Sequence, residues 1–226
     1  MRSPARGFKS ALFLSLAAAA LAAATSFAGP ILDSIEKTVV YNYEGDVTFT
    51  RNGKTLPVGL DTHCLKGDVY RTGSGSSDTM DIAILGVMGV RLLSGTELKI
   101  VTVQKTLIHF AMASGDVLIK TIEKLPDGTE LRIDTPNSTV VVTDNGTQFW
   151  ASVRSGPNGT GSFFASRKGR ISVTINKSSA SVSVLEGLAL DVPADTYIPN
   201  ARNATEEEFK RMRQCNQLPI ITPENS

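Results

Sequence analysis

Residues 131–153 read LRIDTPNSTVVVTDNGTQFWASV and contain three short apolar runs separated by turn residues. The runs are Leu131-Arg-Ile-Asp, Thr139-Val-Val-Val-Thr and Gln148-Phe-Trp-Ala-Ser-Val. They are rich in β-branched and aromatic side chains, which favour strands, and Asp, Pro, Asn and Gly between them favour turns. The stretch therefore predicts three consecutive β-strands.

The same pattern extends in both directions, from Thr38 to Val192. Further runs of this kind, mostly with a period of two, are Val47-Thr-Phe-Thr, Met80-Asp-Ile-Ala-Ile, Glu97-Leu-Lys-Ile-Val, Val117-Leu-Ile-Lys-Thr-Ile, Ile171-Ser-Val-Thr-Ile and Ser181-Val-Ser-Val-Leu. A period of two predicts one buried face and one face in water, and no long stretch in this region has a helical period. We therefore predict an all-β fold, with a sandwich, a barrel and a solenoid as the alternatives.

Glycines mark the turns in this pattern. Asn52 and Gly53 follow the first strand and favour a type I′ hairpin turn. Gly45–Val47, Gly67–Val69 and Gly115–Val117 each read Gly-Asp-Val, which predicts a turn leading into a strand. Recurrent units of this kind indicate a coiled or rolled β-architecture, although their spacing is too irregular for a strict solenoid repeat.

The chain changes character after Val192, so residues 193–226 are predicted to form a C-terminal extension. Thr205 and Glu208 have the spacing of a capping box, which predicts one short helix that begins after Thr205. We expect this helix to cover the open end of the β-domain. Residues 155–161, rich in Gly, Ser and Asn, are expected to form an irregular loop.

The N-terminus has the three parts of a secretory signal. Arg2, Arg6 and Lys9 precede an apolar run over residues 11–24, and Ser26-Phe27-Ala28 supplies small residues at the positions that a signal peptidase reads. We predict a cleavable signal over residues 1–28 and a periplasmic or secreted protein, with an uncleaved membrane anchor as the alternative. No later segment of the sequence is apolar enough to span a membrane.

The remaining 198 residues are nearly neutral: three of the 23 basic residues lie in the signal, which leaves 20 basic against 22 acidic residues. This balance gives no electrostatic reason to expect a nucleic-acid partner. The chain has two cysteines, Cys64 and Cys215. In an oxidising compartment they could pair in a disulfide, or they could be two separate thiols, and the sequence leaves both alternatives open.

The sequence contains no convincing catalytic or metal-binding motif. His63 and His109 are the only histidines, too few for a recognised zinc pattern, and His109 is expected on the polar face of a strand. Gly73 and Gly75 precede a strand rather than a helix, so no helix N-terminus is present to hold a phosphate. We therefore predict no enzyme activity and no cofactor. Trp150, with Tyr41, Tyr43 and Tyr70, is a candidate platform for stacking against a sugar, and ordinary core or interface aromatics are the alternative.

The ordered motifs resemble those of the FecR domain over residues 38–192. The resemblance begins with Leu65-Lys-Gly-Asp-Val-Tyr-Arg-Thr-Gly and the strand at Met80, and it continues with Ser114-Gly-Asp-Val-Leu-Ile and Ile133-Asp-Thr-Pro. The turn residues that carry it are Gly67, Asp68, Thr72, Gly73, Gly115, Asp116, Thr135, Pro136, Gly146 and Thr147.

This resemblance implies a twisted β-roll or solenoid-like domain, with a β-sandwich as the alternative, of a kind first known from bacterial iron-transport regulators outside the inner membrane. Those regulators carry a sigma-binding segment, whereas only residues 1–10 precede the apolar run here, so we do not expect that role. We expect a non-catalytic interaction module that binds an envelope protein. The alternatives are a carbohydrate- or cell-wall-binding protein and a structural protein that assembles through its sheet edges.

Overall fold

The computed structural model describes residues 38–123, 125–142, 144–195, 198–218 and 220–221, so the predicted signal over residues 1–28 lies outside the described residues. Within these ranges the chain forms sixteen β-strands, followed by a helix α1 (Glu206–Met212) and a 3₁₀ turn η2 (Arg213–Gln217). The predicted all-β class with a short C-terminal helix is confirmed.

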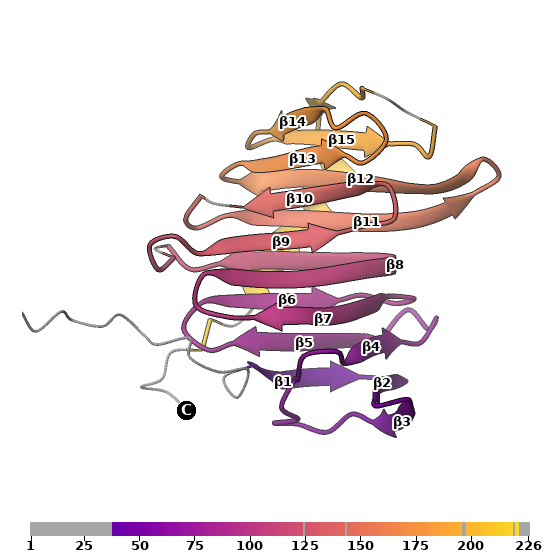
Figure 1. Cartoon of the computed structure of the whole chain (residues 1–226), viewed down its shortest axis with the longest axis vertical. Helices are drawn as coiled ribbons and strands as arrows, with labels where there is room; N and C mark the ends of the chain where they lie inside the picture. Colours follow the sequence, from indigo (N-terminus) through magenta and orange to yellow (C-terminus); the bar gives the residue numbers. More distant parts are fainter. Residues whose placement is uncertain (1–37, 124, 143, 196–197, 219, 222–226) are drawn as a thin grey trace, which may run out of the picture.

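The strands form two stacked sheets that share one long strand, β8 (Figure 1). The first sheet contains, in spatial order, β1 (Thr38–Glu44), β5 (Thr79–Ile84), β6 (Met88–Leu92), the second half of β8 (Leu107–Thr121), β11 (Gln148–Gly156), β12 (Gly159–Lys168), β15 (Leu188–Val192) and β16 (Arg202–Asn203). The second sheet contains β3 (Lys54–Pro57), β2 (Val47–Arg51), β4 (Val69–Thr72), β7 (Glu97–Val103), the first half of β8, β9 (Glu130–Asp134), β10 (Ser138–Val142), β13 (Ile171–Ile175) and β14 (Ser181–Val184).

The chain alternates between the two sheets as it climbs the long axis of the molecule (Figure 1). β1 lies in the first sheet, β2 to β4 in the second, β5 and β6 in the first again, and the alternation continues to β15 and β16. Among the paired strands only β8 and β9 are parallel. This progression is that of a β-roll, the predicted architecture; the sandwich alternative describes the two layers but not the order in which the chain builds them.

Asn52 and Gly53 form the tight turn between β2 and β3, with φ of 52° and 75°. Positive φ at both central positions is the signature of a type I′ turn, so this prediction is confirmed.

The Gly-Asp-Val motif at Gly115 behaves differently from the copies at Gly45 and Gly67. Gly115, with φ of 83°, lies inside β8, where the strand leaves β7 and β9 of the second sheet and joins β6 and β11 of the first. The predicted turn between two strands was therefore wrong at this position. The left-handed glycine bends one continuous strand from one sheet into the other.

The main hydrophobic core lies between the two sheets. Alternate residues of the strands point into it, for example Leu131 and Ile133 of β9 and Val140 and Val142 of β10. Each fully buried aliphatic side chain of this size stabilises the fold by about 1.5–3 kcal/mol, so the core accounts for most of the driving force.

A second, smaller cluster lies on the outer face of the first sheet, under α1 and η2. Its members come from β8, β11, β12, β15 and the C-terminal turns: Leu118, Trp150, Phe163, Ala165, Ala189, Met212, Cys215 and Leu218. The strands beneath it are buried on both faces, unlike the predicted half-exposed strands. We had expected the helix to cover the open end of the domain, and this was wrong. The helix covers a sheet face instead, because the outer face carries apolar side chains that need a partner.

Residues 155–161 form a hairpin rather than an irregular loop. β11 continues to Gly156 and β12 starts at Gly159, with cross-strand pairs along the whole ribbon. This hairpin projects sideways from the body of the roll (Figure 1).

Candidate interaction surfaces

The turn residues that carry the FecR-like resemblance have structural contacts within the fold. Asp68 is almost fully buried and accepts hydrogen bonds from Arg51 Nε (2.9 Å), Arg51 Nη2 (2.7 Å) and the amide of Leu65 (2.7 Å). The Thr72 hydroxyl donates to the carbonyl of Leu93 at 2.6 Å. These polar atoms have partners within the protein, so they line no open site.

The glycine-rich loop after Thr72 encloses a carboxylate of the protein itself. The amides of Gly75 and Asp46 donate to Asp78 at 2.8 and 3.1 Å. A Cβ at Gly73 would lie 2.3 Å from Asp78 Oδ2, and one at Gly45 would lie 1.9 Å from Asp78 Oδ1, so a side chain at either position would push this carboxylate away from its amide donors. Sequence reasoning did not single out Asp78, although the Asp that closes this run of glycines and serines was a usable signal.

The remaining motif residues also have internal partners. Trp150 Nε1 donates to Asp116 Oδ1 at 2.8 Å, and the hydroxyl of Ser162 donates to that of Thr135 at 2.9 Å. Pro136 lies in the turn between β9 and β10, Gly146 has φ of 64°, and the Thr147 amide donates to Thr121 Oγ1 at 2.9 Å. The residues that carry the resemblance therefore describe a fold and not a binding site.

Trp150 is not an open ligand platform. Only 5% of the side chain is exposed. The ring of Phe163 meets it edge-on at 4.7 Å, and the guanidinium groups of Arg154 and Arg211 lie over it at 5.5 and 4.9 Å. The prediction of a sugar-stacking platform was wrong because α1 and these arginines cover the face that the strand pattern leaves open.

The two cysteines are free and buried, and they belong to different hydrophobic clusters. Of the two alternatives left by the sequence, the structure therefore contains separate thiols and not the disulfide. Burial raises the pKa of both Cys64 and Cys215 to about 12, so neither is a reactive thiolate at neutral pH.

No cluster of three or more potential metal ligands occurs in the part of the chain that the structure describes. Within the same ranges, none of the helical segments has the length and apolar character needed to cross a bilayer. His109 lies on the outer face of the second sheet, with Nε2 2.7 Å from Asp134 Oδ2. Asp134 also accepts hydrogen bonds from Arg132 Nε (3.0 Å) and Thr139 Oγ1 (2.9 Å).

This arrangement predicts a pH-dependent stability. Partial burial alone would raise the pKa of Asp134, but hydrogen bonds from Arg132, His109 and Thr139 outweigh it and lower the pKa. A carboxylate whose pKa is lower in the folded protein stabilises the fold at pH values above its unfolded-state pKa of about 3.9. This contribution is lost as the pH falls through the folded-state pKa. We expect Asp134→Asn to be less stable than the wild type in urea at neutral pH, with a difference that shrinks below about pH 4. A difference that stays constant with pH would contradict this.

Exposed hydrophobic side chains gather at the N-terminal end of the roll, formed by β1, β3 and the connection over residues 58–65. Among the described residues, five of the seven exposed large hydrophobic side chains lie there: Tyr41, Tyr43, Leu56, Leu60 and Leu65. Tyr41 is 49% exposed and Leu60 61%. Their proximity follows from backbone bonds, since the amide of Asp61 donates to the carbonyl of Val40 at 2.9 Å.

Two sheet edges are open at this end. Residues 38–40 of β1 bond to the connection over residues 58–65, but β1 bulges at Tyr41, and residues 42–44 pair only with β5 among the described residues. Within the part of the chain that the structure describes, β3 pairs only with β2, and all four of its residues are exposed. Unpaired strand edges beside apolar side chains are suited to the addition of a strand from another chain.

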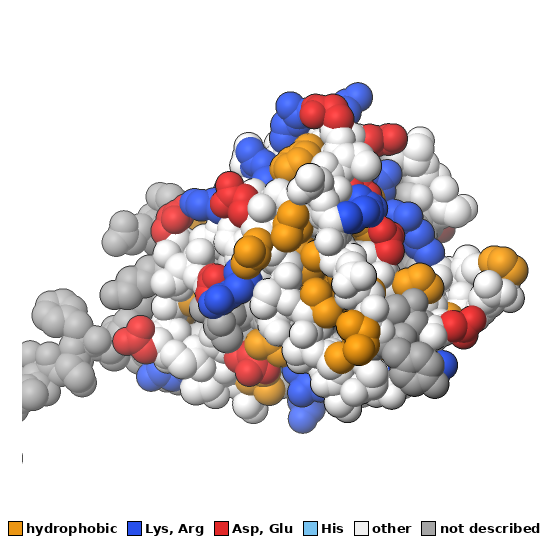
Figure 2. Space-filling model, turned by 90° about the horizontal axis from the view of Figure 1, so that it is seen from above, with side chains coloured by type: hydrophobic (Ala, Val, Ile, Leu, Met, Phe, Trp, Pro, Cys, Tyr) orange, Lys and Arg blue, Asp and Glu red, His pale blue; other side chains and the backbone are white. Residues whose placement is uncertain are grey.

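The C-terminal end of the roll is the other open end. Figure 2 views the molecule from above, onto this end, and shows a band of hydrophobic side chains flanked by Lys, Arg, Asp and Glu. Its exposed large hydrophobic residues are Leu185 (50%) and Ile198 (69%), and the edge strand is β14. Among the described residues, this end has fewer exposed large hydrophobic side chains than the N-terminal end.

Comparison with known proteins identifies a fold relative. No family model and no curated protein matches the chain. Two crystal structures, at 1.65 and 2.50 Å resolution, of a protein from Parabacteroides distasonis ATCC 8503 described as "a putative anti-sigma factor" match with a TM-score of 0.53 and 14% identity. The similar region covers 65% of this chain and 64% of that one. At this identity the similarity shows a shared fold.

Proposed function

We propose, from the fold that this chain shares with a protein described as "a putative anti-sigma factor", that it is a non-catalytic, FecR-like interaction module that binds an envelope protein outside the cytoplasm. The shared fold supports a module of regulatory type. The FecR-like motifs and the predicted signal over residues 1–28 support the finer assignment and the periplasmic or secreted location.

The observation that carries the proposal is the N-terminal end of the roll. Exposed Tyr41 and Leu60 lie beside two open edges, and aromatic and aliphatic anchors next to unpaired backbone are what strand addition uses. The partner in this proposal is an extended segment of another protein, which pairs with an edge and places side chains against these residues.

Affinity capture with the purified exported protein tests this proposal. A partner retained from envelope extract by the wild type and identified by mass spectrometry is expected to bind Tyr41→Glu and Leu60→Glu at least about tenfold more weakly, because an anchor in an interface centre is worth roughly 2 kcal/mol. The matched controls, Leu185→Glu and Ile198→Glu, place the same charge on exposed positions at the other end and are expected to retain the partner.

Loss of the partner in the control variants but not in Tyr41→Glu and Leu60→Glu would contradict the proposed surface. Retention of no protein at all, together with binding to peptidoglycan, would favour the carbohydrate-binding alternative, for which Trp150 no longer provides a motive. Concentration-dependent assembly in ultracentrifugation, abolished by the same N-terminal variants, would favour the structural alternative.

A further inference from the structure

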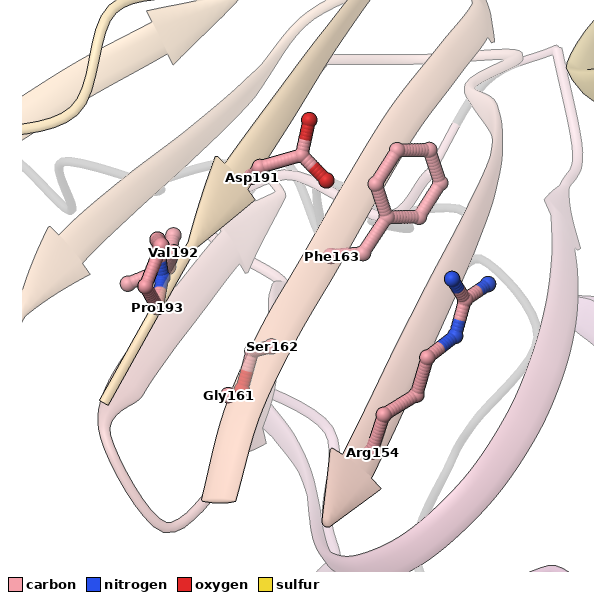
Figure 3. A pocket seen from close by; sticks show the side chains of 7 residues that line it. All are labelled: Arg154, Gly161, Ser162, Phe163, Asp191, Val192 and Pro193. Carbon is pink, nitrogen blue, oxygen red and sulfur yellow. The ribbon is translucent and has the colours of Figure 1, made fainter. Parts of the chain in front are cut away.

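The outer face of the first sheet carries an ordered grid of side chains beside α1. In β11, Trp150, Ser152 and Arg154 alternate onto this face, and across the β11–β12 ribbon Ser152 lies opposite Phe163 and Arg154 opposite Gly161. The cluster under α1 covers the part of the grid around Trp150. The part around Arg154 and Gly161 stays open, and it forms a hollow (Figure 3).

Arg154, which lines this hollow, forms no ion pair with any residue that the structure describes. Its Nε donates to Ser152 Oγ at 3.0 Å, and its guanidinium lies 5.5 Å from the Trp150 ring centre and 5.6 Å from that of Phe163. These contacts hold the group in place and leave the outward Nη1 and Nη2 donors unused among the described residues. A guanidinium held in this way is prepared for a bidentate bond to a carboxylate.

The neighbouring arginines differ from Arg154 in having acidic partners. Arg202 pairs with Asp191 at 2.9 Å and with Glu208 at 2.8 Å, and Arg211 pairs with Asp116 at 3.3 Å. Asp191, on the other side of Phe163 in Figure 3, is thus already compensated. Of the two charged side chains that line the hollow, Asp191 is therefore paired with Arg202, and Arg154 forms no ion pair among the described residues, although Glu207 and Glu208 line the neighbouring pocket on its other side.

The rest of the hollow is mainly apolar and small. It is open to solvent and has a volume of about 170 Å³. Besides Arg154 it is lined by Phe163, Val192, Pro193, Ser162 and Asp191, and by Gly161, which has no side chain to fill the space opposite Arg154. This volume is below the roughly 300–1,000 Å³ of sites that enclose whole small molecules. It suits one aliphatic side chain beside the guanidinium.

We propose that this hollow binds the C-terminal carboxylate of a peptide chain that ends in an aliphatic residue. The carboxylate pairs with Arg154, and the last side chain, attached to the same carbon, lies over Gly161 against Phe163 and Pro193. This inference rests on a different surface from the N-terminal end, so the two proposals can fail separately.

The chain's only tryptophan reports directly on this site, because Arg154 lies over its ring. The experiment follows the indole N–H resonance and the Arg154 Nε–H resonance by NMR in the full exported chain during titration with N-acetylleucine. We expect saturable shifts with a Kd of about 1–10 mM, the range for a fragment of this size. N-acetylleucinamide, which lacks the charge, and acetate, which lacks the side chain, are expected to bind at least about fivefold more weakly.

Arg154→Gln is expected to abolish the shifts of the indole resonance, and Arg154→Lys, which keeps the charge but not the planar fork, to weaken binding by about threefold to tenfold. The matched control is Arg170→Gln, at an exposed arginine elsewhere, which is expected to bind like the wild type. Leu60→Glu is also expected to bind normally, which separates this test from that of the proposed function.

Three results would overturn the proposal: no shift with N-acetylleucine, equal binding of acetate, or undiminished binding by Arg154→Gln. Equal binding of N-acetylglutamate α-amide would likewise overturn it, since the carboxylate would then be recognised on any acidic side chain rather than at a chain terminus.

Discussion

Gly115→Ala is expected to destabilise the protein by about 2–5 kcal/mol, which combines roughly 1–2 kcal/mol for a left-handed alanine with roughly 1–3 kcal/mol for overpacking. Gly115 has φ of 83°, and a Cβ there would lie 2.4 Å from Thr96 Cα and 2.6 Å from the carbonyl oxygen of Gly95. Both atoms belong to the backbone of the facing turn, so the clash cannot be relieved by a side-chain rotation.

The loss would be large because this is the point at which β8 joins the two sheets. The Thr96 hydroxyl and the backbone of Asp116 exchange hydrogen bonds in both directions at 2.9 Å, which pins the facing turn to the bend. A shift of the strand to accommodate a methyl group would break these bonds and disturb pairing on both sides.

Gly67→Ala is the matched control, because Gly67 begins the same Gly-Asp-Val motif, has φ of 92° and has nothing within 4 Å of an added Cβ. It is expected to lose only the backbone contribution of about 1–2 kcal/mol. Urea unfolding of the two variants and the wild type provides the measurement. Equal losses in the two variants would show that the bend tolerates a side chain and that the steric argument is wrong.

Asp68→Asn is the second substitution with a large expected effect, about 3 kcal/mol. The carboxylate is 1% exposed and accepts hydrogen bonds from two Arg51 nitrogens and the Leu65 amide. An amide of the same shape removes the charge and turns one acceptor into a donor that faces other donors. The Arg51 guanidinium, 28% exposed, then loses its counter-ion.

The matched control is Glu97→Gln, which removes the same charge from an ion pair of similar length, Arg71 Nε to Glu97 Oε2 at 2.8 Å. Both of its partners are more than a third exposed, so the loss is expected to stay below about 1 kcal/mol. Chemical denaturation again measures both variants. If Asp68→Asn cost no more than Glu97→Gln, the motif aspartate would not be the structural anchor that its contacts indicate.

The local features of the fold could be predicted from the sequence because each depends on neighbouring residues. The hairpin at Asn52 and Gly53 follows from their tolerance of positive φ, and the helix after Thr205 follows from its capping box, which the structure contains with Glu208 as the partner. The resemblance named the turn residues but assigned them no role, and it did not reveal that Gly115 and Asp116 lie inside a strand. The internal hydrogen bonds of these residues in the structure show that their role is structural.

The candidate site could not be predicted in the same way. Trp150 looked like a ring in an ordinary half-exposed strand, and only the position of α1 on the sheet covers it. Arg154 was not singled out, since its lack of an acidic partner depends on which carboxylates the fold brings near. Leu56 and Leu60 were not singled out either; Leu56 lies in β3, which is the last described strand of its sheet, and Leu60 lies in the connection that follows.

By itself, the sequence determined the all-β class, the tight hairpin turn and the capped helix, because propensity, turn chemistry and capping act over a few residues. Only the tertiary structure decided that Gly115 bends one strand between two sheets, that α1 covers a face and not an end, and that exposed anchors gather at the N-terminal end. The physical reason is that strand pairing and burial join residues far apart in the chain, and alternation within a strand does not specify which neighbour will cover each face.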